Sequence, residues 1–233
     1  MTLMSQRDSE WAPARTTFVL GGARSGKSAY AERLAAASGL PVSYLATAAS
    51  PQLDGTPVDA EFAKRIAVHR ARRPAHWRTI ETGIDLAGAL NRAQLEIQAE
   101  AEALAQAQCE AQAEAQAYAK AEAKHEAKVP IPAVGGCILV DCLTLWLTAL
   151  FYSDGKDGPC ADWAARIDAF DEALASSGSR VIVVSNEIGL GVVPMGAQTR
   201  QFVDELGRLN QRIAARCDEV VMMVAGIPMS VKP

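Results

Sequence analysis

The sequence predicts a single α/β domain with a mostly parallel sheet and helices on both faces. Short runs rich in Val, Ile and Leu recur at 16–20, 137–141 and 180–187. Such nearly continuous apolar runs are typical of strands that are buried on both faces of a parallel sheet. Amphipathic segments of helical period separate them, as expected when helices cover such a sheet. The third observation is a glycine-rich turn at 21–28, between the first strand and the first helix.

The expected elements follow from the apolar period and from the residues that end each segment. Gly39 and Pro41 end the first helix, and Pro74 ends a basic helix further along. The segment 135–151 begins as a buried strand and continues as a helix. In chain order, we expect strands at 16–20, 42–48, 180–187 and 219–226, and helices at 27–37, 58–73, 166–178 and 197–217.

Composition narrows the class of protein. The chain has 233 residues, of which 49% are hydrophobic, enough to build one sizeable core. A net charge of −4 does not suit a nucleic-acid-binding surface. No apolar run approaches the roughly 18 residues of a membrane-spanning helix, and the polar stretch at 1–15 lacks the apolar region of a secretory signal. We expect that stretch to be a disordered leader.

The five cysteines are scattered and form no C-x-x-C pair. This pattern argues against a zinc ribbon or a disulfide framework and suits a reducing compartment. We therefore expect a cytoplasmic protein that neither binds nucleic acid nor spans a membrane.

One segment, at about 92–133, does not fit the alternation of strands and helices. It consists almost entirely of Ala, Glu, Gln and Lys, and alanine takes every second position over 99–107 and again over 111–123. A period of two suggests a strand, but these residue types favour helices. We expect a helical insertion into the domain at 16–233, either a solvated or partly disordered spacer or an interaction arm.

The turn at 21–28 reads G-x-x-x-x-G-K-S, the pattern of a phosphate-binding P-loop. Its glycines allow the backbone to approach phosphate oxygens, and the N-terminus of the following helix adds partial positive charge. Lys27 is expected to reach the β- and γ-phosphates, and Ser28 offers a hydroxyl to Mg²⁺. The strand before the turn and the helix after it are the context that this motif requires.

Asp141 ends a buried apolar strand, where P-loop proteins place the acid that holds Mg²⁺ through water. The same carboxylate could cap the helix that follows, and this alternative does not exclude the metal role. Glu187 ends another buried strand and is a second acid that could line the site.

The segment 61–81 carries five arginines, one lysine and two of the three histidines of the chain. A solvated basic helix is one interpretation. Near a bound triphosphate, however, a neutral His69 could attack the α-phosphorus while the arginines stabilise the developing charge. His76, beside Trp77, is expected to be structural, and His125 in the alanine-rich segment is expected to be inert.

At these motifs the sequence resembles the bifunctional adenosylcobinamide kinase/adenosylcobinamide-phosphate guanylyltransferase family of cobalamin biosynthesis. Its most specific patterns are R-I-x-x-H-R-x-x-R-P-x-x-W at 65–77 and S-N-E-I-G-x-G-V-V-P at 185–194. The resemblance covers the chain in order, apart from 1–15 and about 92–133. It implies a P-loop domain related to the RecA type and assembly as a homotrimer. Because the alanine-rich segment could alter a subunit contact, the oligomeric state stays open.

The resemblance also implies the chemistry. The family phosphorylates adenosylcobinamide with a nucleoside triphosphate, ATP or GTP. It then transfers GMP from GTP to the new phosphate through a GMP–histidine intermediate and forms adenosylcobinamide-GDP. The histidine of the family motif corresponds to His69. Lys27 is the second residue with a catalytic role, and Ser28 and Asp141 would hold Mg²⁺. Asp141 stands where some relatives have Glu. The implied nucleotide contacts are Gly21, Gly22, Ala23, Arg24, Ser25, Gly26, Lys27, Ser28, Ala46, Thr47, Ala48, Arg70, Ala71, Arg72, Arg73, Glu81 and Asp141.

Two other functions are compatible with the motifs. The first is a plain small-molecule kinase in which His69 is structural. The second is a nucleotide-dependent regulatory protein, which the arginine–histidine segment disfavours because a switch needs no nucleophile. The sequence does not mark the corrinoid-binding surface.

Overall fold

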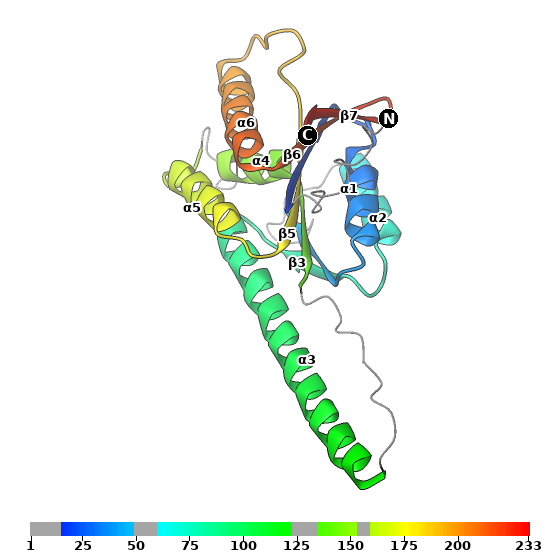
Figure 1. Ribbon diagram of the computed structural model, residues 1–233. Coiled ribbons are helices and arrows are strands. Elements are labelled where there is room, and N and C mark those ends of the chain that lie inside the picture. Colours follow the sequence, from blue (N-terminus) through cyan, green and yellow to red (C-terminus); the bar gives the residue numbers. More distant parts are fainter. Residues whose placement is uncertain (1–14, 49–59, 123–134, 153–158) are drawn as a thin grey trace, which may run out of the picture.

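The computed structural model describes residues 15–48, 60–122, 135–152 and 159–233, and its centre is a seven-stranded sheet (Figure 1). The strand order is β3-β2-β4-β5-β1-β6-β7. Neighbouring strands are parallel except for β6 and β7. The strands are β1 (Thr16–Gly21), β2 (Val42–Ala46), β3 (Arg78–Glu81), β4 (Cys137–Asp141), β5 (Arg180–Asn186), β6 (Glu219–Val224) and β7 (Ile227–Lys232). The predicted α/β class with a mostly parallel sheet is confirmed.

Helices cover both faces of the sheet, as predicted (Figure 1). One face packs against α3 (Leu86–Glu122), α4 (Leu143–Tyr152), α5 (Trp163–Ala175) and α6 (Ala197–Arg216). The other face carries α1 (Lys27–Ala37) and α2 (Ala60–Arg72). Two hydrophobic cores result, one on each side of the sheet.

Successive side chains of the central strands point to opposite faces of the sheet, so each strand contributes to both cores. Phe18 belongs to the core under α3 to α6, whereas its neighbour Val19 belongs to the core under α1. Val183 and Ile182 of β5 divide in the same way, and all four side chains are fully buried. Because both faces are covered, the strands read as continuous apolar runs in the sequence.

Two strands differ from the prediction. The chain does not stop pairing at 226, because it turns back as β7 and pairs antiparallel with β6. Most residues of β7 are exposed, so the strand lacks the apolar run that marked the others. The short edge strand β3 was not predicted as a separate strand for a similar reason, since its four residues are largely exposed.

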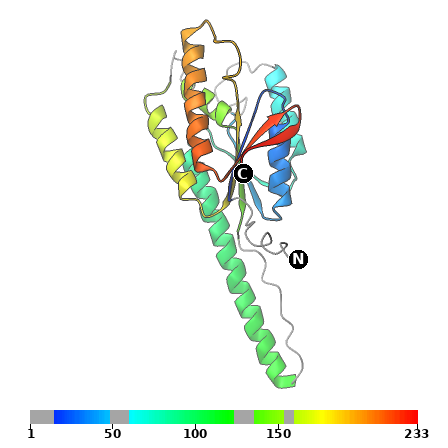
Figure 2. The ribbon, with the colours of Figure 1, turned by 45° about the horizontal axis from the view of Figure 1, so that its top comes forward.

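The described part of the alanine-rich segment, up to Glu122, belongs to a single long helix, α3, of 37 residues. Its first turns place Leu86, Leu90, Ala93 and Ile97 in the core, so the helix begins before the expected start at 92. It stays packed on the core to Ile97, and Glu100 still forms an ion pair with Arg78 of β3. Beyond that point the described side chains are largely exposed, and Figures 1 and 2 show the helix projecting away from the sheet. The leader, the end of the insertion and His125 lie outside the described residues.

No helix within the described ranges has the length and apolar character needed to cross a membrane.

Candidate functional site

The glycine-rich turn between β1 and α1 has the geometry of an anion-binding loop. A Cβ on Gly21 would lie 2.4 Å from Ser25 Oγ and 2.9 Å from the Met223 carbonyl oxygen, so only glycine fits there. Gly26 precedes α1 with a φ of +92°, a conformation that L side chains rarely adopt. The first N–H groups of an α-helix have no partner within the helix, and among the described residues no side chain caps Gly26 and no acid lies in the first turn. The end of α1 can therefore accept an anion.

A cavity of about 720 Å³ opens at the carboxyl ends of β2, β4 and β5, beside this loop. Ten of the predicted site residues line it: Ala23, Arg24, Gly26, Lys27, Ser28, Ala48, His69, Arg72, Arg73 and Asp141. These residues are far apart in the sequence. The fold brings the P-loop and the end of α2, which carries His69 and Arg72, to the same cavity.

The other predicted nucleotide contacts lie outside the lining of this cavity: Gly21, Gly22, Ser25, Ala46, Thr47, Arg70, Ala71 and Glu81. Thr47 has a visible structural role, because its hydroxyl donates to the Cys142 carbonyl and accepts from the Cys142 N–H, each at 2.7 Å. Arg70 and Glu81 form an ion pair with each other near the surface. Lys27 extends back along the loop and donates to the Gly22 carbonyl at 3.3 Å.

His69 is only partly exposed and has both cations and carboxylates beside it. Arg72 Nη2 lies 3.1 Å from His69 Nδ1, and because a guanidinium can only donate, this arrangement requires an unprotonated Nδ1. Burial lowers the pKa of His69, as do Arg72, Arg73 and Lys27, whereas Asp141 opposes the shift. The imidazole is therefore neutral at neutral pH, the form that a nucleophile needs.

Asp141 is held by Tyr44 on the neighbouring strand β2. The Tyr44 hydroxyl donates to Asp141 Oδ2 at 2.7 Å, and burial together with the nearby carboxylate raises the pKa of Tyr44, so the phenol remains a donor. The Arg73 guanidinium lies 3.7 Å from the centre of the Tyr44 ring, a cation–π contact. Together these contacts fix Arg73 and Asp141 on the wall of the cavity.

Glu32 is a neighbour of this group that the sequence analysis missed. Ligand atoms of Glu32, His69 and Asp141 all lie within 4.8 Å of one another, and Arg72 also contacts Glu32 at 3.3 Å. Burial raises the pKa of Glu32, although Arg72 opposes this. Spacing could have revealed it, because Glu32 follows Ser28 by four residues, which is about one turn of α1.

The oxygen atoms gathered here suit a hard divalent cation. Ser28 and Asp141 line the same cavity, and Glu32 adds a second carboxylate beside Asp141. Hydroxyl and carboxylate oxygens are the ligands that Mg²⁺ prefers. The residues present therefore fit the predicted magnesium ion.

Asn186 is a second residue that the sequence analysis missed. It lies directly beside Gly21 in the pairing of β1 with β5, and it lines the cavity. Its backbone is held on both sides, because its N–H donates to Thr144 Oγ1 at 2.9 Å and its carbonyl accepts from Asn210 Nδ2 at 3.0 Å. Asn186 Oδ1 is buried without a hydrogen-bond partner among the described residues. The predicted neighbour, Glu187, instead accepts the N–H of Gly189.

Comparison with known proteins adds independent information. The model of a family described as cobinamide kinase / cobinamide phosphate guanyltransferase matches residues 17–103 and 110–231. The match includes most of the alanine-rich segment, which we had expected to lie outside the resemblance.

Three relatives are similar over 92% of this chain. The bifunctional adenosylcobalamin biosynthesis protein CobP of Pseudomonas aeruginosa is 46% identical over 214 residues, which are 95% of its length. The proteins of the same description named CobU, from Salmonella typhimurium and Escherichia coli, are 33% and 31% identical, and the similarity spans 98% of each.

Proposed function

The chain belongs to the cobinamide kinase / cobinamide phosphate guanyltransferase family, and we propose that both reactions of the family use the one cavity beside its P-loop. It is a bifunctional cobinamide kinase and cobinamide phosphate guanylyltransferase of cobalamin biosynthesis. The observation that carries the proposal is the position of His69, which lines the same cavity as Lys27 and Ser28.

In the kinase reaction, the P-loop holds the phosphates of ATP or GTP and Lys27 neutralises the β- and γ-phosphates. The remaining predicted contacts, from Ala46 to Ala48, from Arg70 to Arg73, and at Glu81, would hold the rest of the nucleotide. A hydroxyl oxygen of adenosylcobinamide attacks the γ-phosphorus. The bond from that phosphorus to the bridging oxygen breaks, its electron pair stays on the nucleoside diphosphate, and the hydroxyl proton passes to solvent.

In the guanylyl transfer, a ring nitrogen of neutral His69 attacks the α-phosphorus of GTP, and pyrophosphate leaves with the bonding electrons. Arg72 and Arg73 stabilise the negative charge that develops on the phosphate oxygens. An oxygen of adenosylcobinamide phosphate then attacks the same phosphorus and displaces His69, which gives adenosylcobinamide-GDP.

Ser28 and Asp141 would hold Mg²⁺, the latter through water, with Glu32 beside them. The ion would supply positive charge at the phosphate oxygens. We also propose that the enzyme is cytoplasmic and that it assembles as a homotrimer. Light scattering of the full chain would test the trimer through its mass.

GTP labelled at the α-phosphate tests the covalent step. The wild type should acquire label that is stable to base and lost in acid, as a phosphoramidate is, and His69→Ala should acquire none while still phosphorylating adenosylcobinamide. His76→Ala is the matched control, because His76 is an exposed histidine outside the cavity lining. If His69→Ala still forms adenosylcobinamide-GDP at the wild-type rate, the covalent route through His69 is wrong.

A further inference from the structure

The chain between β5 and α6 forms a loop with an unusually exposed set of apolar side chains. We call residues 188–196 the apolar loop. Isolated exposed hydrophobic residues are normal on protein surfaces, but a contiguous group marks a binding surface. Its exposed members are Ile188, Leu190, Val192, Val193 and Met195, of which Val192 and Met195 are 96% and 98% exposed.

Hydrogen bonds at both ends hold this loop in shape. At its start, the Glu187 N–H donates to the Gly21 carbonyl at 3.2 Å, and the Gly189 N–H donates to Glu187 Oε1 at 2.7 Å. At its end, Arg200 of α6 donates to the Pro194 carbonyl at 3.0 Å and also to the Met195 carbonyl. The backbone is therefore fastened to the P-loop and to α6 while the side chains between face solvent.

The apolar loop begins at the nucleotide cavity. It follows Asn186, which lines the cavity and pairs with Gly21, and β5 lies between the P-loop strand β1 and the Asp141 strand β4. Figure 1 shows the segment extending beyond the sheet at the end where β5 finishes. A ligand on this loop would lie next to the phosphates held by the P-loop.

We propose that the apolar loop binds the corrin ring of the cobinamide substrate. A corrin macrocycle is broad and carries extensive apolar surface, so it needs a wide apolar support rather than a deep polar pocket. Its phosphate-accepting arm must also reach the P-loop, and a ring seated on a loop that begins beside Gly21 meets that condition. The proposal rests on the kinase site proposed at the P-loop but not on the chemistry of His69.

Two single variants, Val192→Ser and Met195→Ser, test the proposal in the full chain. Each should raise the KM for adenosylcobinamide in the kinase assay about tenfold, which corresponds to ~1.4 kcal/mol of lost binding. The KM for ATP should not change, because neither side chain lines the nucleotide cavity. Equilibrium dialysis, read by the visible absorbance of adenosylcobinamide, should give the same weakening for binding alone.

Val231→Ser is the matched control. Val231 is also an exposed valine, at 65%, but it lies on β7 next to the residue that pairs with the start of β6, far along the sheet from the P-loop end. Its KM for both substrates should equal that of the wild type.

Three results would overturn the proposal. In the first, the loop variants bind adenosylcobinamide as tightly as the wild type. In the second, they change the mass seen by light scattering, which would assign the loop to contact with a second copy of the chain. In the third, they raise the KM for ATP and the KM for adenosylcobinamide by the same factor, which would mean that the loop only supports the P-loop. A wrong assignment of the kinase site can be distinguished from a wrong assignment of the apolar loop. Lys27→Ala tests the kinase site at the P-loop, and the loop variants test only the binding of the corrin ring.

Discussion

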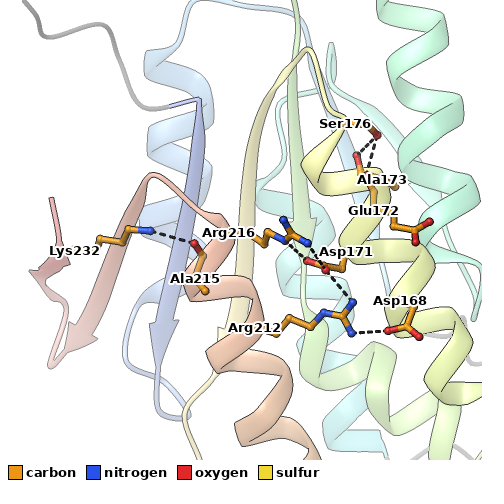
Figure 3. Close-up of polar contacts among 9 residues, drawn as sticks. All are labelled: Asp168, Asp171, Glu172, Ala173, Ser176, Arg212, Ala215, Arg216 and Lys232. Carbon is orange, nitrogen blue, oxygen red and sulfur yellow. Dashed lines mark hydrogen bonds and ion pairs between the residues drawn. The ribbon is translucent and has the colours of Figure 1, made fainter.

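Two groups of charged residues in this molecule use arginine in opposite ways. Between α5 and α6, Arg216 contacts both oxygens of Asp171 at 2.9 and 3.0 Å (Figure 3). Arg212 joins the same carboxylate at 2.8 Å and Asp168 at 2.6 Å. In the cavity, by contrast, Arg73 stacks on the Tyr44 ring and Lys27 donates to a backbone carbonyl.

The difference indicates which group is structural. Asp171 is almost fully buried, and a buried carboxylate is tolerated when hydrogen bonds and opposite charge satisfy it, as they do here. Arg73 and Lys27 in the cavity have weaker partners, an aromatic ring and a backbone carbonyl, that an arriving phosphate can replace. We therefore expect variants of the α5–α6 cluster to change stability and not activity, and variants of the cavity group to do the reverse.

The largest effect should come from Lys27→Ala. Removal of one preorganised charge from a phosphoryl-transfer site costs about 10²–10³-fold in rate, and we expect both the kinase and the guanylyltransferase rates to fall by at least this factor. The free energy of unfolding, measured in urea, should change by less than ~0.5 kcal/mol, because the side chain makes only a 3.3 Å contact with a carbonyl. Full retention of either activity would show that the two reactions do not share the P-loop.

The next effect should come from Asp171→Asn, and it should appear in stability alone. The variant weakens three charge-assisted contacts, two from Arg216 and one from Arg212, which should reduce the free energy of unfolding by about 2 kcal/mol at pH 7. Urea titration measures the loss, with both enzyme rates measured in parallel. A drop in kinase rate without a change in unfolding would contradict the structural assignment.

The same variant has a pH signature. Burial alone would raise the pKa of Asp171, but hydrogen bonds and charge from Arg216 and Arg212 outweigh it and hold that pKa below its ordinary value. The ion-pair stabilisation is therefore complete above the unfolded-state pKa of ~3.9 and is lost as the pH falls through the lower folded-state value. The difference between wild type and Asp171→Asn should shrink below about pH 4 and stay constant from pH 5 to 8.

The sequence could predict those parts of the fold and of the site that depend on one contiguous stretch of residues. The P-loop and the buried strands were predictable because each is a short, continuous sequence pattern. His69 could be placed near phosphate because arginines surround it within five residues of sequence. In the same way, Asp141 was predictable as an acid at the end of an apolar strand.

The missed residues depend on strand order, which no single stretch encodes. Asn186 meets the P-loop because β5 lies beside β1, and Tyr44 meets Asp141 because β2 pairs with β4. The strand β7 was missed because its exposed residues leave no apolar run. The long helix α3 was predicted from residue type, but its attachment to the core through Ile97 required knowledge of what packs against it.

The smallest effect tests two predicted nucleotide contacts that the cavity lining does not include. Arg70 and Glu81 form an exposed ion pair, and such pairs contribute about 0–1 kcal/mol. Glu81→Gln should therefore leave unfolding nearly unchanged. If Glu81 contacts GTP, as the family resemblance implies, the same variant should raise the KM for GTP about threefold to tenfold. Glu96→Gln is the control, because Glu96 forms an ion pair of similar exposure with Arg78 but lies on α3, outside the cavity lining. Equal KM values for the two variants would remove Glu81 from the nucleotide site, whereas a difference between them would extend the site from the cavity to the end of β3.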